Sequence, residues 1–162
     1  MSYEVNELNT PKLNLRKILF LDFDGVLHSD LDLNANFCKV PCLEKFLIEM
    51  PDVEIVISST WRENYSLKEL KAFSPALLRD RIIDVTPVLE GGFYRGGRQR
   101  EIEDYLQTNG LQAINASWVA LDDWVELFDK GCSFLIWVNP ARGFGDDEGR
   151  ALVRWYETGS AF

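Results

Sequence analysis

One short stretch, residues 18–27, constrains both the fold and the chemistry of this chain. It opens with four apolar residues, ends at a glycine turn and is too short for a buried helix, so it is typical of a buried strand. Asp22 and Asp24 follow the apolar run, and in an extended chain their side chains start out on the same side. Adjacent carboxylates repel each other unless a cation lies between them, and Mg²⁺ is commonly held by carboxylates, water and phosphate. The stretch therefore predicts a strand that ends in a magnesium site rather than in an ordinary Asp-Gly turn.

The apolar periodicity of the chain predicts strands and helices in alternation. Further strands are expected at residues 53–57, 81–86, 118–121 and 134–138, and helices at 41–50, 65–80 (broken near Ser74 and Pro75), 98–109 and 146–156. Residues 90–97 are rich in glycine and are expected to form a flexible loop. This alternation favours an α/β fold, a three-layer Rossmann-like sandwich with a central, mainly parallel five-stranded sheet.

Length and composition indicate one globular domain. With 162 residues and a net charge of −9, the chain is long enough for one core and is not expected to coat nucleic acid non-specifically. Residues 1–16 and 158–162 are expected to be tails. No apolar run reaches the roughly 20 residues needed to span a bilayer, so no membrane contact is expected. The chain start lacks an apolar signal region, and three cysteines without a Cys-x-x-Cys pair favour a reduced, cytoplasmic setting.

Polar residues follow three of the five predicted strands. They are Asp22 and Asp24 after the first strand, Ser58 and Ser59 after the second, and Asp122 and Asp123 after the fourth. Ligands of open parallel sheets bind beyond the carboxyl ends of the strands. We therefore expect these side chains to converge on one site at that edge of the sheet.

The segment 22–26, Asp-Phe-Asp-Gly-Val, resembles the first motif of the haloacid dehalogenase (HAD) superfamily of phosphohydrolases. The resemblance extends over about residues 17–140, with its motifs in the expected order. More narrowly, segments 22–28, 58–62, 98–102 and 121–123 together resemble the small HAD domains of bacterial "Swiss Army Knife" RNA-repair proteins. The resemblance implies a single HAD-like catalytic domain over residues 17–157 and a Mg²⁺-dependent phosphatase.

The resemblance also implies a role for each acidic residue. Asp22 is the nucleophile that forms an aspartyl-phosphate intermediate, and Asp24 is the general acid and base. The metal ligands are Asp22, Asp24 through its backbone carbonyl, and the pair Asp122 and Asp123. Which member of that pair ligates directly and which acts through water stays open.

Phosphate contacts are expected from hydroxyl, backbone and arginine groups. The resemblance places the catalytic hydroxyl at Ser58 and a donating backbone N–H at Ser59, although a shift of one residue would exchange them. The resemblance also implies a catalytic cation, Lys or Arg, near the start of the helix that precedes the fourth strand. Arg98 is preferred because it lies where the glycine-rich loop meets that helix, and Arg95 and Arg100 are the alternatives. Arg95 is also a candidate substrate contact.

Three residues near the first two motifs are further candidates, and two of them allow more than one interpretation. Arg62 is predicted to be a phosphate clamp at the site. Trp61 is either a core residue or a stacking platform. His28, the one histidine of the chain, either lines the entrance to the site or is structural.

Residues 26–52 and 61–97 leave no room for a large cap over the site. An open site favours a bulky substrate, so the predicted partner is a phosphorylated nucleic-acid end or another phosphorylated macromolecule. A phosphatase for nucleotides or sugar phosphates is one alternative. A HAD-fold binding module without turnover is the other.

Overall fold

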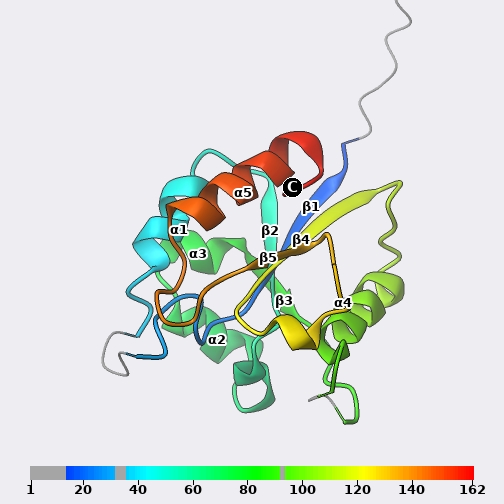
Figure 1. The fold of residues 1–162 in the computed structure, drawn as a ribbon, viewed down its shortest axis with the longest axis horizontal. Coiled ribbons are helices and arrows are strands. Elements are labelled where there is room, and N and C mark those ends of the chain that lie inside the picture. Colours follow the sequence, from blue (N-terminus) through cyan, green and yellow to red (C-terminus); the bar gives the residue numbers. More distant parts are fainter. Residues whose placement is uncertain (1–13, 32–35, 92–93) are drawn as a thin grey trace, which may run out of the picture.

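Five strands form one sheet in which every neighbouring pair is parallel. The computed structural model describes residues 14–31, 36–91 and 94–162, and the spatial strand order is β3-β2-β1-β4-β5 (Figure 1). The strands are β1 (Arg16–Leu21), β2 (Val53–Ile57), β3 (Ile82–Val85), β4 (Ala116–Asp122) and β5 (Leu135–Trp137). This topology confirms the three-layer Rossmann-like α/β sandwich predicted from the sequence.

Helices and short 3₁₀ turns connect these strands in the described part of the chain. They are α1 (Val40–Leu47), η1 (Thr60–Glu63), α2 (Leu67–Phe73), α3 (Ala76–Arg81), α4 (Gly97–Thr108), η2 (Val125–Leu127) and α5 (Asp146–Thr158). The predicted helical segment 65–80 divides at Ser74 and Pro75, because proline disfavours helical backbone in the residue before it. The sequence pattern did not indicate η1 or η2, since so few residues carry no periodicity. The predicted loop 90–97 lies partly outside the described residues.

The central strand β1 is buried on both faces of the sheet. Leu19 and Leu21 pack into the core formed with α1, α2, α3 and α5, whereas Ile18 and Phe20 pack into the core formed with α4. Side chains alternate between the faces of a strand, so a strand covered on both sides needs a continuous apolar run. The predicted tail 158–162 is not free, because Ala161 is buried in the first of these cores.

The carboxyl ends of β1, β2 and β4 form the edge at which polar residues gather, and α2 and α4 lie on either side of the end of β1 (Figure 1). Between β1 and β2 the described residues hold one helix, α1. Between β2 and β4 they hold η1, α2, α3, β3 and α4, and no cap domain. None of the helices in the described residues is long and apolar enough to span a membrane.

Candidate active site

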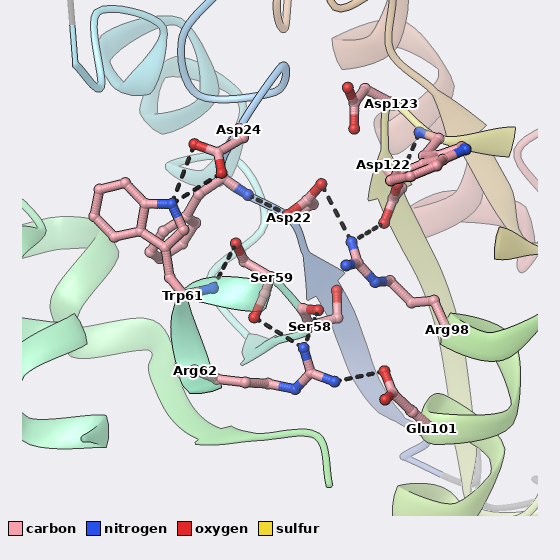
Figure 2. Close-up of polar contacts among 12 residues, drawn as sticks. Asp22, Asp24, Ser58, Ser59, Trp61, Arg62, Arg98, Glu101, Asp122 and Asp123 are labelled. Atoms are coloured by element: carbon pink, nitrogen blue, oxygen red, sulfur yellow. Dashed lines mark hydrogen bonds and ion pairs between the residues drawn. The ribbon is translucent and has the colours of Figure 1, made fainter. Parts of the chain in front are cut away.

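Three carboxylates meet where β1 and β4 end (Figure 2). Leu21 and Leu121 are paired in the parallel register, so Asp22 and Asp122, the residues that follow them, lie level on neighbouring strands. Together with Asp123 they place one oxygen each within 4.8 Å of one another. Asp22 is 6 % exposed and Asp122 is fully buried. The convergence expected from the polar strand ends is therefore present in the folded chain.

This acidic cluster is electrostatically costly without a cation. Burial raises the pKa of Asp122 to about 7, and the charge of Asp22 adds to the rise. Burial and the charges of Asp22 and Asp122 raise the pKa of Asp123 to about 8. These shifts mean that protons are held at the cluster near neutral pH unless another positive charge replaces them.

Arg98 supplies part of the missing positive charge. From the first turn of α4, its Nη1 lies 2.7 Å from Asp122 Oδ2 and 3.2 Å from Asp22 Oδ2. Burial works against the charge of Arg98, but the two carboxylates raise its pKa further above its ordinary value. Arg100, by contrast, is exposed and pairs with Asp129 and Glu103. Of the three arginines predicted as the cation, the structure places Arg98 at the cluster.

The donor set suits a hard divalent cation. When Asp22, Asp122 and Asp123 are all ionised, three negative charges face the one positive charge of Arg98, so a divalent ion would complete the balance. All three ligand atoms are carboxylate oxygens, which Mg²⁺ prefers. The side chain of Asp24 does not belong to this group. Its predicted metal contact through the backbone carbonyl stays a prediction.

Gly25 lets the chain turn tightly against the cluster. Its φ of +69° lies in the left-handed region, and a Cβ at this position would lie 2.3 Å from Asp123 Oδ2. Only glycine satisfies both conditions without moving the carboxylate. Gly25 therefore leaves room for the carboxylate of Asp123, a candidate metal ligand from the end of β4.

The Asp24 carboxylate is turned away from the acidic cluster and held by two neighbours. Trp61 Nε1, from η1, donates to both oxygens at 3.0 and 3.1 Å, and His28 Nε2 lies 3.0 Å from Oδ1. The backbone N–H of Phe37 donates to His28 Nδ1 at 3.4 Å, so Nε2 carries the proton and donates to Asp24. The Asp24 side chain is still 52 % exposed, so its carboxylate is accessible to a substrate.

Trp61 and His28 thus contact a candidate catalytic group directly. Trp61 is partly buried and makes edge contacts with the rings of Phe23 and Phe37. Sequence reasoning placed both residues near the site but missed their hydrogen bonds to Asp24. The one available signal was that each lies within four residues of a motif residue.

The two serines that follow β2 have different surroundings. The backbone N–H of Ser58 donates to Leu21 O and extends the β1–β2 ladder, while the buried Ser58 hydroxyl has no hydrogen-bond partner within the described ranges. Ser59 Oγ instead accepts from the backbone N–H of Trp61 and caps η1. Of the two hydroxyls, that of Ser58 is therefore the one whose hydrogen bonds are not already used within the described chain. Figure 2 shows Ser58 between Arg62 and the Asp22–Arg98 pair.

Arg62 differs from its prediction as a phosphate clamp. Its guanidinium is buried and donates to four backbone carbonyls and to Glu101 on α4. These contacts occupy all five of its N–H groups, so none is left for a phosphate. The physical reason is the turn at η1, which directs the side chain under the sheet edge, where it joins η1, the end of β3 and α4. Arg95, the other predicted contact, is exposed in the loop before α4.

A family model described as the HAD domain in Swiss Army Knife RNA repair proteins matches residues 18–148. No curated protein and no solved structure gives a significant match. The matched segment covers well over half of the chain and contains every residue of the acidic cluster, together with Asp24, Ser58 and Arg98. The chain therefore belongs to the family of HAD domains of Swiss Army Knife RNA repair proteins, which are HAD-type hydrolase domains.

Proposed function

We propose that this protein is a Mg²⁺-dependent phosphatase that works through an aspartyl-phosphate on Asp22 and acts on phosphorylated nucleic-acid ends. The observation that carries the proposal is the convergence of Asp22, Asp122 and Asp123, the first two paired with Arg98, near a Ser58 hydroxyl that has no partner among the described residues. A buried hydroxyl without a partner is costly in a folded protein unless a ligand completes it. A phosphate oxygen is the ligand that suits such a donor beside an arginine.

The reaction divides into two displacements at phosphorus. An Asp22 oxygen attacks phosphorus, the bond to the leaving oxygen breaks, and Asp24 gives its proton to that oxygen. Asp24 then takes a proton from water, whose oxygen attacks the phosphorus of the aspartyl-phosphate and releases inorganic phosphate and free Asp22. Every proton that Asp24 donates in the first step is recovered in the second.

Charge compensation comes from the groups around Asp22. Arg98 and the Ser58 hydroxyl, with the Ser59 backbone N–H, would contact the phosphate oxygens, and Arg95 would contact the substrate from the loop. Mg²⁺, held by Asp22, Asp122 and Asp123 with the Asp24 carbonyl, would supply positive charge beside the phosphate. The fixed positions of Arg98 and Asp122 in the buried cluster preorganise this environment.

The proposed substrate follows from the openness of the site and from the family to which the chain belongs. No cap covers the site within the described residues, so a long phosphorylated chain has access to it. The matched family is named for RNA repair proteins. We therefore propose oligonucleotide ends ahead of free nucleotides or sugar phosphates.

Phosphate release tests the proposal directly. Wild-type protein with Mg²⁺ is expected to release phosphate from 3′- or 5′-phosphorylated oligonucleotides, and acid quenching during turnover should trap a phosphoryl group on Asp22 that mass spectrometry detects. Asp22→Asn should abolish both signals, whereas Asp104→Asn, an exposed carboxylate on α4, should change neither. Turnover limited to sugar phosphates would favour the small-molecule alternative. Lack of turnover on every phosphate would favour the non-catalytic alternative.

A further inference from the structure

The position of Asp24 defines the side of the site on which the leaving group lies. On the proposed function, Asp24 protonates the leaving oxygen, so the leaving group must contact the Asp24 carboxylate. That carboxylate is hydrogen-bonded to Trp61 on η1, at 3.0 and 3.1 Å. The leaving group therefore lies beside η1 and the segment that leads into α2.

The surface beside Trp61 is formed by exposed aromatic rings. The ring centroids of Tyr65 and Phe73 lie 5.0 Å apart, and each lies within 6.0 Å of the Trp61 centroid. Tyr65 is 41 % exposed and Phe73 is 42 % exposed. The capping box between Ser66 and Glu69 fixes the turn between the two rings and so holds them together.

Unpaired cations lie on the same helix as Phe73. Lys68 and Lys71 of α2, with Arg79 of α3, line a hollow of about 460 Å³. Their side chains form no ion pair or hydrogen bond with any residue in the described part of the chain, whereas Arg62, Arg98 and Arg100 are all paired. Glu69 and Asp80 adjoin these cations in the sequence, so the attraction for an anionic ligand comes from the unpaired state of the three side chains rather than from an excess of positive charge.

We propose that Tyr65 and Phe73 form a subsite for the nucleobase of the leaving nucleoside, and that Lys68, Lys71 and Arg79 neutralise nearby phosphates of the same single strand. This inference rests on the proposed function, because Asp24 connects the subsite to the reaction. Aromatic rings that stack bases, together with cations that neutralise the backbone phosphates, are the means by which proteins bind single-stranded nucleic acid without sequence readout. A phosphotyrosine peptide would occupy the rings but would leave the cations without phosphates to neutralise.

Base stacking is tested by binding rather than by turnover. The probe is a short oligonucleotide that carries a terminal phosphate and 2-aminopurine as its terminal base, in a 3′ and a 5′ version, bound to Asp22→Asn protein with Mg²⁺. Stacking should quench the fluorescence of 2-aminopurine. Since stacking contributes about 1–3 kcal/mol per base, removing both rings by Tyr65→Ala with Phe73→Ala should raise Kd about tenfold or more and remove the quenching.

Matched variants separate stacking from general damage. Tyr65→Phe keeps the ring and should keep the quenching. Phe162→Ala removes an aromatic side chain that is 70 % exposed in the C-terminal segment, and it should leave Kd unchanged. An abasic version of the probe should bind protein that retains Tyr65 and Phe73 about as weakly as the intact probe binds the double alanine variant.

The cations are tested by salt dependence. Lys68→Gln with Lys71→Gln should reduce the slope of log Kd against log salt by about 0.7 for each phosphate contact that is lost. Lys45→Gln with Arg150→Gln removes the same formal charge from α1 and α5 and should preserve the slope. An unchanged slope in the α2 variant would overturn the role of the lysines.

The possible failures of the two proposals are distinguishable. Oligonucleotide binding with quenching but no turnover on any phosphate would contradict the phosphatase and leave the subsite supported. Turnover with equal affinity for intact and abasic probes would overturn the subsite and leave the phosphatase supported. Tighter binding of a phosphotyrosine peptide than of the oligonucleotide would also overturn the subsite.

Discussion

Asp24 depends on two neighbouring donors for the direction of its carboxylate. The indole N–H of Trp61 reaches both oxygens and His28 reaches one, so rotation of the carboxylate away from the substrate side breaks hydrogen bonds to a charged group. The two donors thus act on catalysis through Asp24 rather than by touching the phosphate.

Trp61→Phe should lower kcat for an alkyl phosphate by about ten- to a hundredfold, because a hydrogen bond to a charged group contributes about 1.5–3 kcal/mol. A nitrophenyl phosphate should lose less, since its leaving oxygen does not need a proton. Steady-state kinetics on both substrates measure the difference. Trp118→Phe, a tryptophan on β4, is the control and should affect neither rate. Equal losses on both substrates in Trp61→Phe would indicate a packing defect instead.

Gly25→Ala should weaken Mg²⁺ binding on the order of 10–100-fold, as is typical when the support of a metal ligand is disturbed. The new Cβ would meet Asp123 Oδ2 at 2.3 Å. Gly110→Ala is the matched control, because Gly110 has a φ of +67° but no atom within 4 Å of an added Cβ. Both variants should lose about 1–2 kcal/mol of stability from left-handed strain. Titration calorimetry with Mg²⁺ should separate them, and equal affinities would contradict the steric argument.

At the scale of elements, two long-range contacts hold the covering helices in place. Arg62 joins η1, the end of β3 and α4 through its five donors, so the turn after β2 is fixed to the helix that supplies Arg98. On the other face of the sheet, α1 and α5 approach closely at Gly149, where an added Cβ would lie 2.1 Å from Phe46 Cε2.

Gly149→Ala distinguishes helix propensity from packing. Propensity alone predicts a stabilisation of about 1 kcal/mol in the middle of a helix, whereas overpacking against Phe46 should destabilise by about 1–3 kcal/mol. We expect destabilisation, measured by urea unfolding. In a Phe46→Leu background the same change should cost less, because the ring that obstructs the Cβ is gone. Additive effects of the two substitutions would contradict the contact.

For the whole molecule, the acidic cluster links stability to pH and to Mg²⁺. Because the pKa of Asp123 is raised from its ordinary value of 3.8 to about 8, and that of Asp122 to about 7, the metal-free native state binds more protons than the unfolded state. The free energy of unfolding must then fall as pH rises from about 4 towards 8. A bound divalent cation takes the place of the protons and should remove most of this loss.

Chemical unfolding across this pH range, with Mg²⁺ or with a chelator, measures the effect. The stabilisation by Mg²⁺ should grow as pH rises, since protons compete for the same carboxylates. Asp123→Asn should flatten the metal-free profile and reduce the Mg²⁺ effect. Metal-free and Mg²⁺ profiles that run parallel over the whole range would show that the cluster does not exchange protons for the cation.

The sequence pattern predicted the strands and the polar residues at their ends, and the rule that ligands of parallel sheets bind at the carboxyl ends of the strands predicted the convergence of Asp22 with Asp122. A continuous apolar run specifies a strand buried on both faces, and parallel register then places the next residues of neighbouring strands level. The tight turn at Gly25 and the placement of Asp22 and Asp24 at a strand end could also be predicted from the sequence, because they depend on residues that are adjacent in the chain.

Tertiary structure alone decided how the flanking side chains are used. Trp61 and Arg62 are neighbours in the sequence, yet η1 sends one to Asp24 and the other beneath the sheet edge to Glu101. The choice of Arg98 over Arg100 likewise depends on which side of α4 faces β4. The directions of these side chains arise from packing between elements far apart in the chain. Hydrophobic periodicity describes single elements, so it does not predict that packing.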